Sequence, residues 1–125
     1  MKIATLSNGV RVANFSSPHS FTFTDGTVLD AHSAEDANLL KVNFIEDIDK
    51  DGDVSLTFSL SVAVMQNMDV YIKEYKKGRL DKVLIPLPMM TAIKNLGWNP
   101  KVLPFRCVRI EDRTKRLVSI EKWCI

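Results

Sequence analysis

The chain has 125 residues, of which 46% are hydrophobic and 26% are charged. These fractions are typical of a globular protein and argue against disorder, and the length suits a single domain over residues 1–125. A formal net charge of +2 argues against a general duplex-binding surface, which is strongly basic. The sequence has neither an apolar run long enough to cross a membrane nor a secretory signal, so we expect a cytoplasmic protein with no membrane contact.

Turn-forming residues divide the first half of the chain into three predicted hairpins. Asn8-Gly9 suits the positive φ angles of a tight turn, and apolar residues flank it on both sides. Asp25-Gly26 is a second turn signal of the same kind. A third pair of strand-like runs flanks an aspartate-rich turn. The predicted strands lie within residues 2–15, 21–29, 42–48 and 54–58.

Three helices are predicted from capping residues and apolar spacing. Ser33 is a typical N-cap residue, and Asp36 follows it at the position that completes such a cap. Apolar residues recur every four positions from Leu60 to Ile72, which predicts one buried stripe on a longer helix. A proline suits the start of the third helix, and glycines follow the second and third. The predicted helices span residues 34–40, 59–76 and 89–96, with a strand over residues 82–87.

The last segment alternates apolar and polar residues on both sides of a polar turn, which predicts a long hairpin over residues 102–123. The sequence contains no internal repeats. It therefore predicts an α+β fold with a mostly antiparallel sheet built from hairpins and two or three helices packed on one face. Cys107 and Cys124 fall on neighbouring strands, and without a secretion signal we expect both thiols to be reduced.

The segment over residues 47–54 matches the first eight positions of a calcium-binding loop, including the turn glycine Gly52. The twelfth position should carry a bidentate glutamate, but it is Phe58, and the flanking segments have strand character. We interpret this segment as an acidic hairpin turn. No cysteine or histidine pair has zinc-binding spacing, and no metal site or cofactor is predicted.

A short serine-rich segment brings hydroxyl groups near an imidazole in the sequence. Ser17 and Ser20 flank His19, which gives the composition of a nucleophilic site. A working triad also needs a group that orients the base and an oxyanion hole, and no motif supplies them. We therefore expect these side chains to bond to the backbone or bind a ligand phosphate, and no catalytic residue is predicted.

Positive charge is concentrated on the predicted C-terminal hairpin. Alternate residues of a strand share a face, so Arg109 lies beside Phe105 or Cys107. A guanidinium group next to an apolar surface can bind phosphate through two hydrogen bonds. The alternative is a charged edge strand that deters aggregation. The other basic residues of this hairpin are Arg106, Arg113, Lys115 and Arg116.

The predicted helix over residues 89–96 presents two polar side chains on one side. Thr91 and Asn95 are four residues apart, and an amide can hydrogen-bond to the edge of a nucleobase. The alternative is that Asn95 is an ordinary residue of a helix C-terminus. Trp98 and Trp123 could stack on a base, although aromatic residues more often belong to a core.

Two parts of the sequence resemble a known family. Residues 14–29, with Ser17-Pro18-His19 and Asp25-Gly26, resemble the phage anti-Thoeris sponge proteins of the first family. The run 83–88, the helix that follows it and the basic hairpin containing Arg109 are similar to that family as well. The resemblance implies a non-enzymatic homo-oligomer that captures glycocyclic ADP-ribose, which TIR-domain proteins of bacterial Thoeris defence make from NAD. Some members also hold cyclic trinucleotides at separate sites.

The resemblance also implies roles for individual residues. Arg109 would pair with phosphate, whereas Asn95, Thr91 and Met90 would contact the base or ribose, and Phe105 or Trp98 would supply an aromatic contact. Two alternatives stay open: a small nucleotide-processing enzyme that uses His19, and a phage protein that inhibits a host protein through a strand edge. The predicted ligand-binding residues are Arg109, Asn95, Thr91, Met90, Phe105, Arg113, Lys115, Ser17 and His19.

Overall fold

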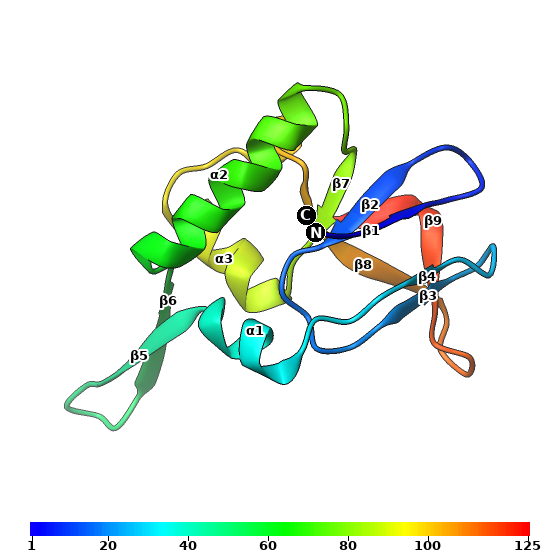
Figure 1. The fold of residues 1–125 in the computed structure, drawn as a ribbon. Helices are drawn as coiled ribbons and strands as arrows, with labels where there is room; N and C mark the ends of the chain where they lie inside the picture. The colour runs from blue at the N-terminus through cyan, green and yellow to red at the C-terminus, as the bar shows by residue number, and fades with distance from the viewer.

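The computed structural model describes residues 1–125 and confirms the predicted α+β class (Figure 1). Seven strands form one curved sheet, and two further strands form a hairpin that projects from it. The strands are β1 (Lys2–Thr5), β2 (Arg11–Asn14), β3 (Phe21–Phe23), β4 (Val28–Leu29), β5 (Asn43–Ile48), β6 (Val54–Ser59), β7 (Lys82–Leu84), β8 (Phe105–Asp112) and β9 (Leu117–Cys124). The helices are α1 (Ala34–Leu39), α2 (Val62–Lys76) and α3 (Leu87–Asn95), and a 3-10 turn, η1, spans Pro100–Val102. None of the three α-helices has the length and apolar character needed to cross a membrane.

The large sheet has the strand order β1-β2-β7-β8-β9-β3-β4. Its end strands β1 and β4 lie close together, so the sheet is nearly closed into a barrel. The hairpins β1–β2, β3–β4, β5–β6 and β8–β9 are antiparallel, as their turn residues predict. Three parallel pairs, β2 with β7, β7 with β8 and β3 with β9, join the hairpins of the large sheet. These pairs were not predicted, because parallel partners are distant in the sequence and leave no local turn signal.

Capping interactions set the helix boundaries. The Ser33 hydroxyl accepts a hydrogen bond from the Asp36 amide at 3.1 Å, which confirms the predicted cap of α1. Helix α2 begins later than predicted, because the Ser61 hydroxyl caps it by accepting from the Val64 amide at 3.2 Å. Helix α3 begins earlier than predicted, with Pro86 at its N-cap, so β7 ends at Leu84.

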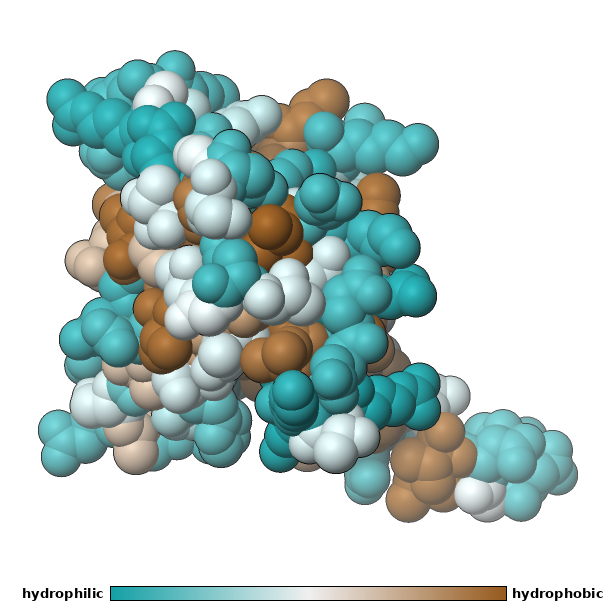
Figure 2. Space-filling view, turned by 90° about the vertical axis from the view of Figure 1, so that its right-hand side faces the viewer, coloured by the Kyte–Doolittle hydropathy of each residue, from teal (hydrophilic) through white to brown (hydrophobic).

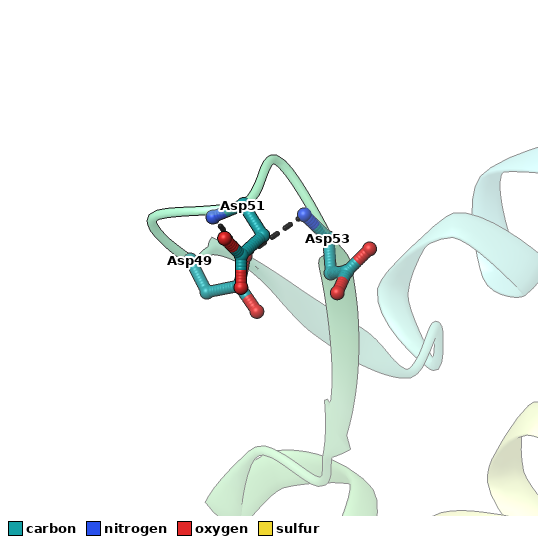
Figure 3. Close-up of side chains that lie close together, drawn as sticks. All are labelled: Asp49, Asp51 and Asp53. Atoms are coloured by element: carbon teal, nitrogen blue, oxygen red, sulfur yellow. Dashed lines mark hydrogen bonds between the residues drawn. The ribbon is translucent and has the colours of Figure 1, made fainter.

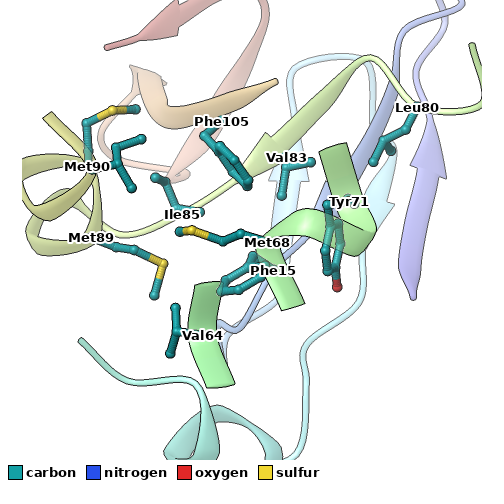
Figure 4. Packing of buried hydrophobic residues seen from close by; sticks show 12 residues of the cluster. Phe15, Val64, Met68, Tyr71, Leu80, Val83, Ile85, Met89, Met90 and Phe105 are labelled. Carbon is teal, nitrogen blue, oxygen red and sulfur yellow. The ribbon is translucent and has the colours of Figure 1, made fainter. Parts of the chain in front are cut away.

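The main hydrophobic core lies between the sheet and helices α2 and α3 (Figure 4). Phe15, which follows β2, is fully buried in its centre. Its ring meets those of Tyr71 and Phe105 edge-on, with centroids 5.1 and 6.4 Å apart. The predicted stripe of α2 contributes the buried Val64 and Met68. A smaller core on the other face of the sheet includes Leu6, Val12, Phe23, Leu29, Leu84 and Val118.

The turns of the first two hairpins are joined by Asp25. Its carboxylate accepts hydrogen bonds from the Ser7 amide at 2.7 Å and the Thr27 amide at 2.8 Å. These donors, the Ser7 amide first, stabilise the ionised form and lower the pKa of Asp25 from 3.8 to about 2. The carboxylate therefore helps to hold β1 near β4, where the sheet approaches closure.

Replacing Asp25 with asparagine is expected to lower the melting temperature by roughly 2 to 4 °C at pH 7, the effect of losing about one net hydrogen bond. A carboxylate with a lowered pKa contributes stability above its unfolded pKa, and that contribution is lost as the pH falls from about 4 through about 2. The difference between Asp25→Asn and the wild type should therefore shrink across this window in thermal melts. Asp30→Asn is the control, because Asp30 is exposed and its side chain accepts no hydrogen bond. A difference that stays constant down to pH 2 would contradict this role of the Asp25 charge.

Candidate functional site

The loop after β2 is held in place by one buried polar side chain. Asn14 is fully buried, and its side-chain oxygen accepts a hydrogen bond from the Ser17 amide at 2.8 Å. Its side-chain nitrogen donates to the carbonyl oxygens of Ser17 and Asp30 at 3.1 and 3.0 Å. The Nε2 atom of His32 is hydrogen-bonded to the Asn14 carbonyl oxygen. The backbone of this loop is therefore fixed against the sheet.

The end of this loop and the start of β3, residues 17–21, form a wall between two hollows. On one side lies an apolar groove of about 1040 Å³, and on the other lies a more polar cavity of about 650 Å³. Both hollows are lined by Ser17, Pro18, His19, Phe21 and Val108. A single ligand that crosses the wall would therefore meet two different chemical environments.

Side chains from both sheets and two helices line the apolar groove. Its volume lies just above the usual range for small-molecule sites, which is roughly 300 to 1,000 Å³. Lys41 and Asn38 are the polar side chains near α1, and the carboxyl end of β7 leads into it. The apolar contributors include Leu40, Phe44, Phe58, Leu87, Met89 and Cys107.

The lining of the polar cavity includes hydroxyl groups and two cations, together with apolar side chains such as Ile110 and Val118. Ser17, Ser20 and Thr22 bring hydroxyls from the wall and β3. Lys115 and Arg116 come from the turn between β8 and β9. That turn is fixed by its own sequence, because the Asp112 carboxylate accepts a hydrogen bond from the Lys115 amide at 3.0 Å. The cavity therefore combines hydrogen-bond donors and positive charge, which suits an anion.

A second basic surface adjoins this cavity. Arg109, Arg113 and Arg116 line an open hollow of about 900 Å³, together with one acidic residue, Glu111. Arg116 belongs to both the open hollow and the polar cavity. The structure therefore brings five of the predicted residues, Arg109, Arg113, Lys115, Ser17 and His19, to one continuous region around Arg116.

The other predicted ligand residues lie elsewhere. Met90 is 1% exposed and Phe105 is fully buried, and both pack in the main core, so neither has surface for a ligand to contact. Thr91 donates its hydroxyl to the Leu87 carbonyl oxygen at 3.2 Å, within its own helix. Asn95 is exposed at the end of α3 and lines none of the three hollows.

The candidate aromatic and basic residues outside the hollows have packing roles. Trp98 packs against the main core, and the Trp123 ring lies 6.2 Å from that of Phe23. The Arg106 guanidinium donates from Nη1 to the carbonyl oxygens of Pro100, Leu103 and Phe105 at 2.6, 2.8 and 2.7 Å. Burial lowers the pKa of Arg106. This arginine therefore holds the segment around η1 and is not a free phosphate ligand.

The acidic segment forms the tip of the β5–β6 hairpin (Figure 3). The Asp49 carboxylate accepts hydrogen bonds from the amides of Asp51 and Asp53, both at 2.9 Å. The three carboxylates lie within 4.8 Å of one another. Strands flank this turn, and Phe58 occupies the position where a calcium loop needs glutamate. These features fit the predicted hairpin turn.

The whole hairpin, which we call the β5–β6 arm (residues 43–59), exposes apolar side chains on its two strands. Figure 2 shows it projecting from the body at the lower right, with hydrophobic side chains along its length and hydrophilic ones at its tip. Two-stranded hairpins are marginally stable alone, and exposed apolar groups of this kind are typical of association surfaces. The residues Phe44, Ile45, Ile48, Val54 and Leu56 are each more than half exposed.

Sequence reasoning missed Asn14 and most of the apolar groove. Asn14 ends an apolar strand two residues before Ser16-Ser17, and an asparagine in that setting signals a side chain that bonds to the backbone of a turn. The groove carries no comparable signal, because α1, β6 and β9 meet there only after folding. In comparisons with known protein families, curated proteins and solved structures, no match to this chain was found.

Proposed function

We propose that this protein is a phage anti-defence protein that binds glycocyclic ADP-ribose in the host cytoplasm and sequesters it without cleavage. The observation that carries the proposal is the wall of residues 17–21, which lines both the apolar groove and the polar cavity. A nucleotide signal has the same two-part character, since its base is a flat, largely apolar ring system and its phosphates are anionic. The family resemblance of the wall sequence supports the same ligand.

The basic side of the wall suits the pyrophosphate. Lys115 provides a point charge, and the guanidinium of Arg116 can bind two phosphate oxygens at once. Hydroxyl groups of Ser17 and Ser20 line the same cavity and can donate further hydrogen bonds. Arg109 then lies in the adjoining open hollow, within the same basic surface.

The apolar side of the wall suits the adenine. Phe21 and Phe58 offer aromatic surface in a groove large enough for a purine. Asn38 lines the same groove, and its amide has both the donor and the acceptor that the edge of adenine requires. We therefore propose that the groove contacts the base, in place of the residues of α3 to which the resemblance assigned that contact.

The hydroxyl and imidazole groups of the wall are not arranged as a nucleophile and its base. A base activates a serine by bonding to its hydroxyl through a ring nitrogen. No hydrogen bond joins a ring nitrogen of His19 to the Ser17 or Ser20 hydroxyl, and the Ser17 hydroxyl accepts one from the backbone amide of His19 at 3.1 Å. This arrangement supports binding over cleavage.

The exposed β5–β6 arm supports the proposal of a homo-oligomer, because a second copy could cover its apolar side chains. A cyclic trinucleotide is a second ligand class to test. The adjoining open hollow lined by Arg109 and Arg113 favours it, since that surface could hold several phosphates.

Binding is tested with the nucleotide product of a TIR-domain NADase. The purified protein should melt at a higher temperature in its presence, because a ligand that binds only the folded state stabilises it. Chromatography of the nucleotide released by heating should return it unchanged. A chemically altered nucleotide would identify an enzyme. If the protein is not stabilised and the nucleotide is not depleted from solution, a host protein would be the remaining candidate for the partner.

Replacing both Lys115 and Arg116 with alanine is expected to weaken binding about 100-fold or more. Each lost hydrogen bond to an ionised group costs about 1.5 to 3 kcal/mol, and about 1.4 kcal/mol corresponds to a factor of ten. Titration calorimetry measures the change. The control is Lys2→Ala with Lys76→Ala, which removes the same charge from exposed positions outside the three hollows. Equal affinities of the two double variants would place the phosphate site elsewhere.

A further inference from the structure

Two cysteines face each other across the last pair of strands. Cys107 of β8 and Cys124 of β9 are direct partners in the antiparallel register, and both thiols are free. Direct partners in such a pair have Cα atoms roughly 4.5 to 5.5 Å apart, whichever type of pair they form. Disulfides span Cα separations of roughly 4.4 to 6.8 Å. The backbone therefore already has the spacing that a disulfide needs.

The two side chains also point the same way and are accessible. Direct cross-strand partners share a face of the sheet, and both cysteines line the apolar groove. Each is only partly buried, so a small reagent in the groove can reach it. Burial raises the pKa of the Cys107 thiol, which makes its reactive thiolate scarce at neutral pH.

We propose that Cys107 and Cys124 form a thiol–disulfide exchange site whose substrate is a low-molecular-weight disulfide such as glutathione disulfide. The thiolate of one cysteine attacks a sulfur of glutathione disulfide, forms a mixed disulfide and releases one glutathione thiolate. The second cysteine, as its thiolate, then attacks the protein sulfur of that mixed disulfide and releases the second glutathione. The protein loses two electrons and two protons, and glutathione disulfide is reduced to two glutathione molecules.

The product is a disulfide between β8 and β9 that lines the apolar groove. It closes the loop that contains the basic turn, so it restricts the unfolded chain more than the folded one. Oxidation should therefore raise the melting temperature by roughly 5 to 10 °C. This inference is independent of the nucleotide proposal, because it concerns only the two thiols and their spacing.

The test incubates the reduced full chain with glutathione disulfide at pH 6.5 and pH 8.0, quenches with acid and measures the intact mass. The wild type should lose two hydrogen atoms, retain no glutathione and remain a single chain on a non-reducing gel. The reaction should be faster at pH 8.0, because more thiolate is present. In Cys107→Ser and Cys124→Ser, the remaining thiol lacks its partner, so the reaction should stop with one glutathione attached.

Three results would overturn the proposal. The first is a wild type that accumulates stable mixed disulfides, which would show that the second thiol cannot reach the first. The second is a wild type that keeps two free thiols under conditions that modify either single variant. The third is a disulfide that forms between chains, which a gel would show as a dimer.

Discussion

Replacing Phe15 with alanine is expected to lower the free energy of unfolding by about 4 kcal/mol, as large-to-small changes at fully buried aromatic residues do. The Phe15 ring is fully buried and contacts the rings of Tyr71 and Phe105 edge-on (Figure 4). Its loss removes apolar surface from the core and leaves a cavity between α2 and the sheet. Urea denaturation of the purified variant measures the change.

Phe44→Ala is the matched control for this prediction. Phe44 is 62% exposed on the β5–β6 arm, so the same substitution there should cost less than about 1 kcal/mol at concentrations where the chain is a monomer. If both variants lost similar stability, the arm would have to be packed in solution and Phe15 would not be the centre of the core.

Replacing Asn14 with alanine is expected to cost about 3 kcal/mol of folding stability and to weaken nucleotide binding as well. Besides a long hydrogen bond of 3.5 Å to the His19 carbonyl oxygen, its side chain makes three shorter ones, with the Ser17 amide and with the carbonyl oxygens of Ser17 and Asp30. Each contributes about 1 kcal/mol net, and their loss leaves buried groups without partners. The wall of residues 17–21 also loses its anchor, so both hollows should lose their shape.

Asn67→Ala is the control for Asn14→Ala. Asn67 is exposed, and its side chain donates only to the Ala63 carbonyl oxygen within α2, at 2.9 Å. Urea denaturation and titration calorimetry should separate the two variants clearly. If Asn14→Ala lost stability but kept full affinity, the wall would not be part of the ligand site.

Local signals in the sequence were sufficient for the hairpins and for most of the helices. Asn8-Gly9 and Asp25-Gly26 have positive φ at their glycines, of 86° and 85°, which is what their turns require. The four-residue apolar spacing correctly identified the buried face of α2, with Val64 and Met68 in the core. These signals depend only on neighbours in the chain. The three parallel strand pairs depend on distant segments, and no local pattern encodes them.

The same distinction applies to the candidate site. Lys115, Arg113, Ser17 and His19 were selected by the chemistry of their side chains, and polar side chains of this kind lie at the surface where the hollows form. The predictions for Met90 and Phe105 depended on which face of a helix or strand points outward. Both side chains point into the core. Apolar residues at such positions add more stability by burial than an exposed position would offer.

The position of β9 in the sheet has a consequence for biosynthesis. β9 lies between β8 and β3, and the pairing of Thr22 with Leu117 joins distant parts of the chain. β9 leaves the ribosome after both of its neighbours, so the nascent chain carries two unpaired strand edges until β9 has emerged. The barrel therefore closes only late in synthesis. Shielding by a chaperone during this interval would limit aggregation, and truncation before β9 would yield an insoluble product.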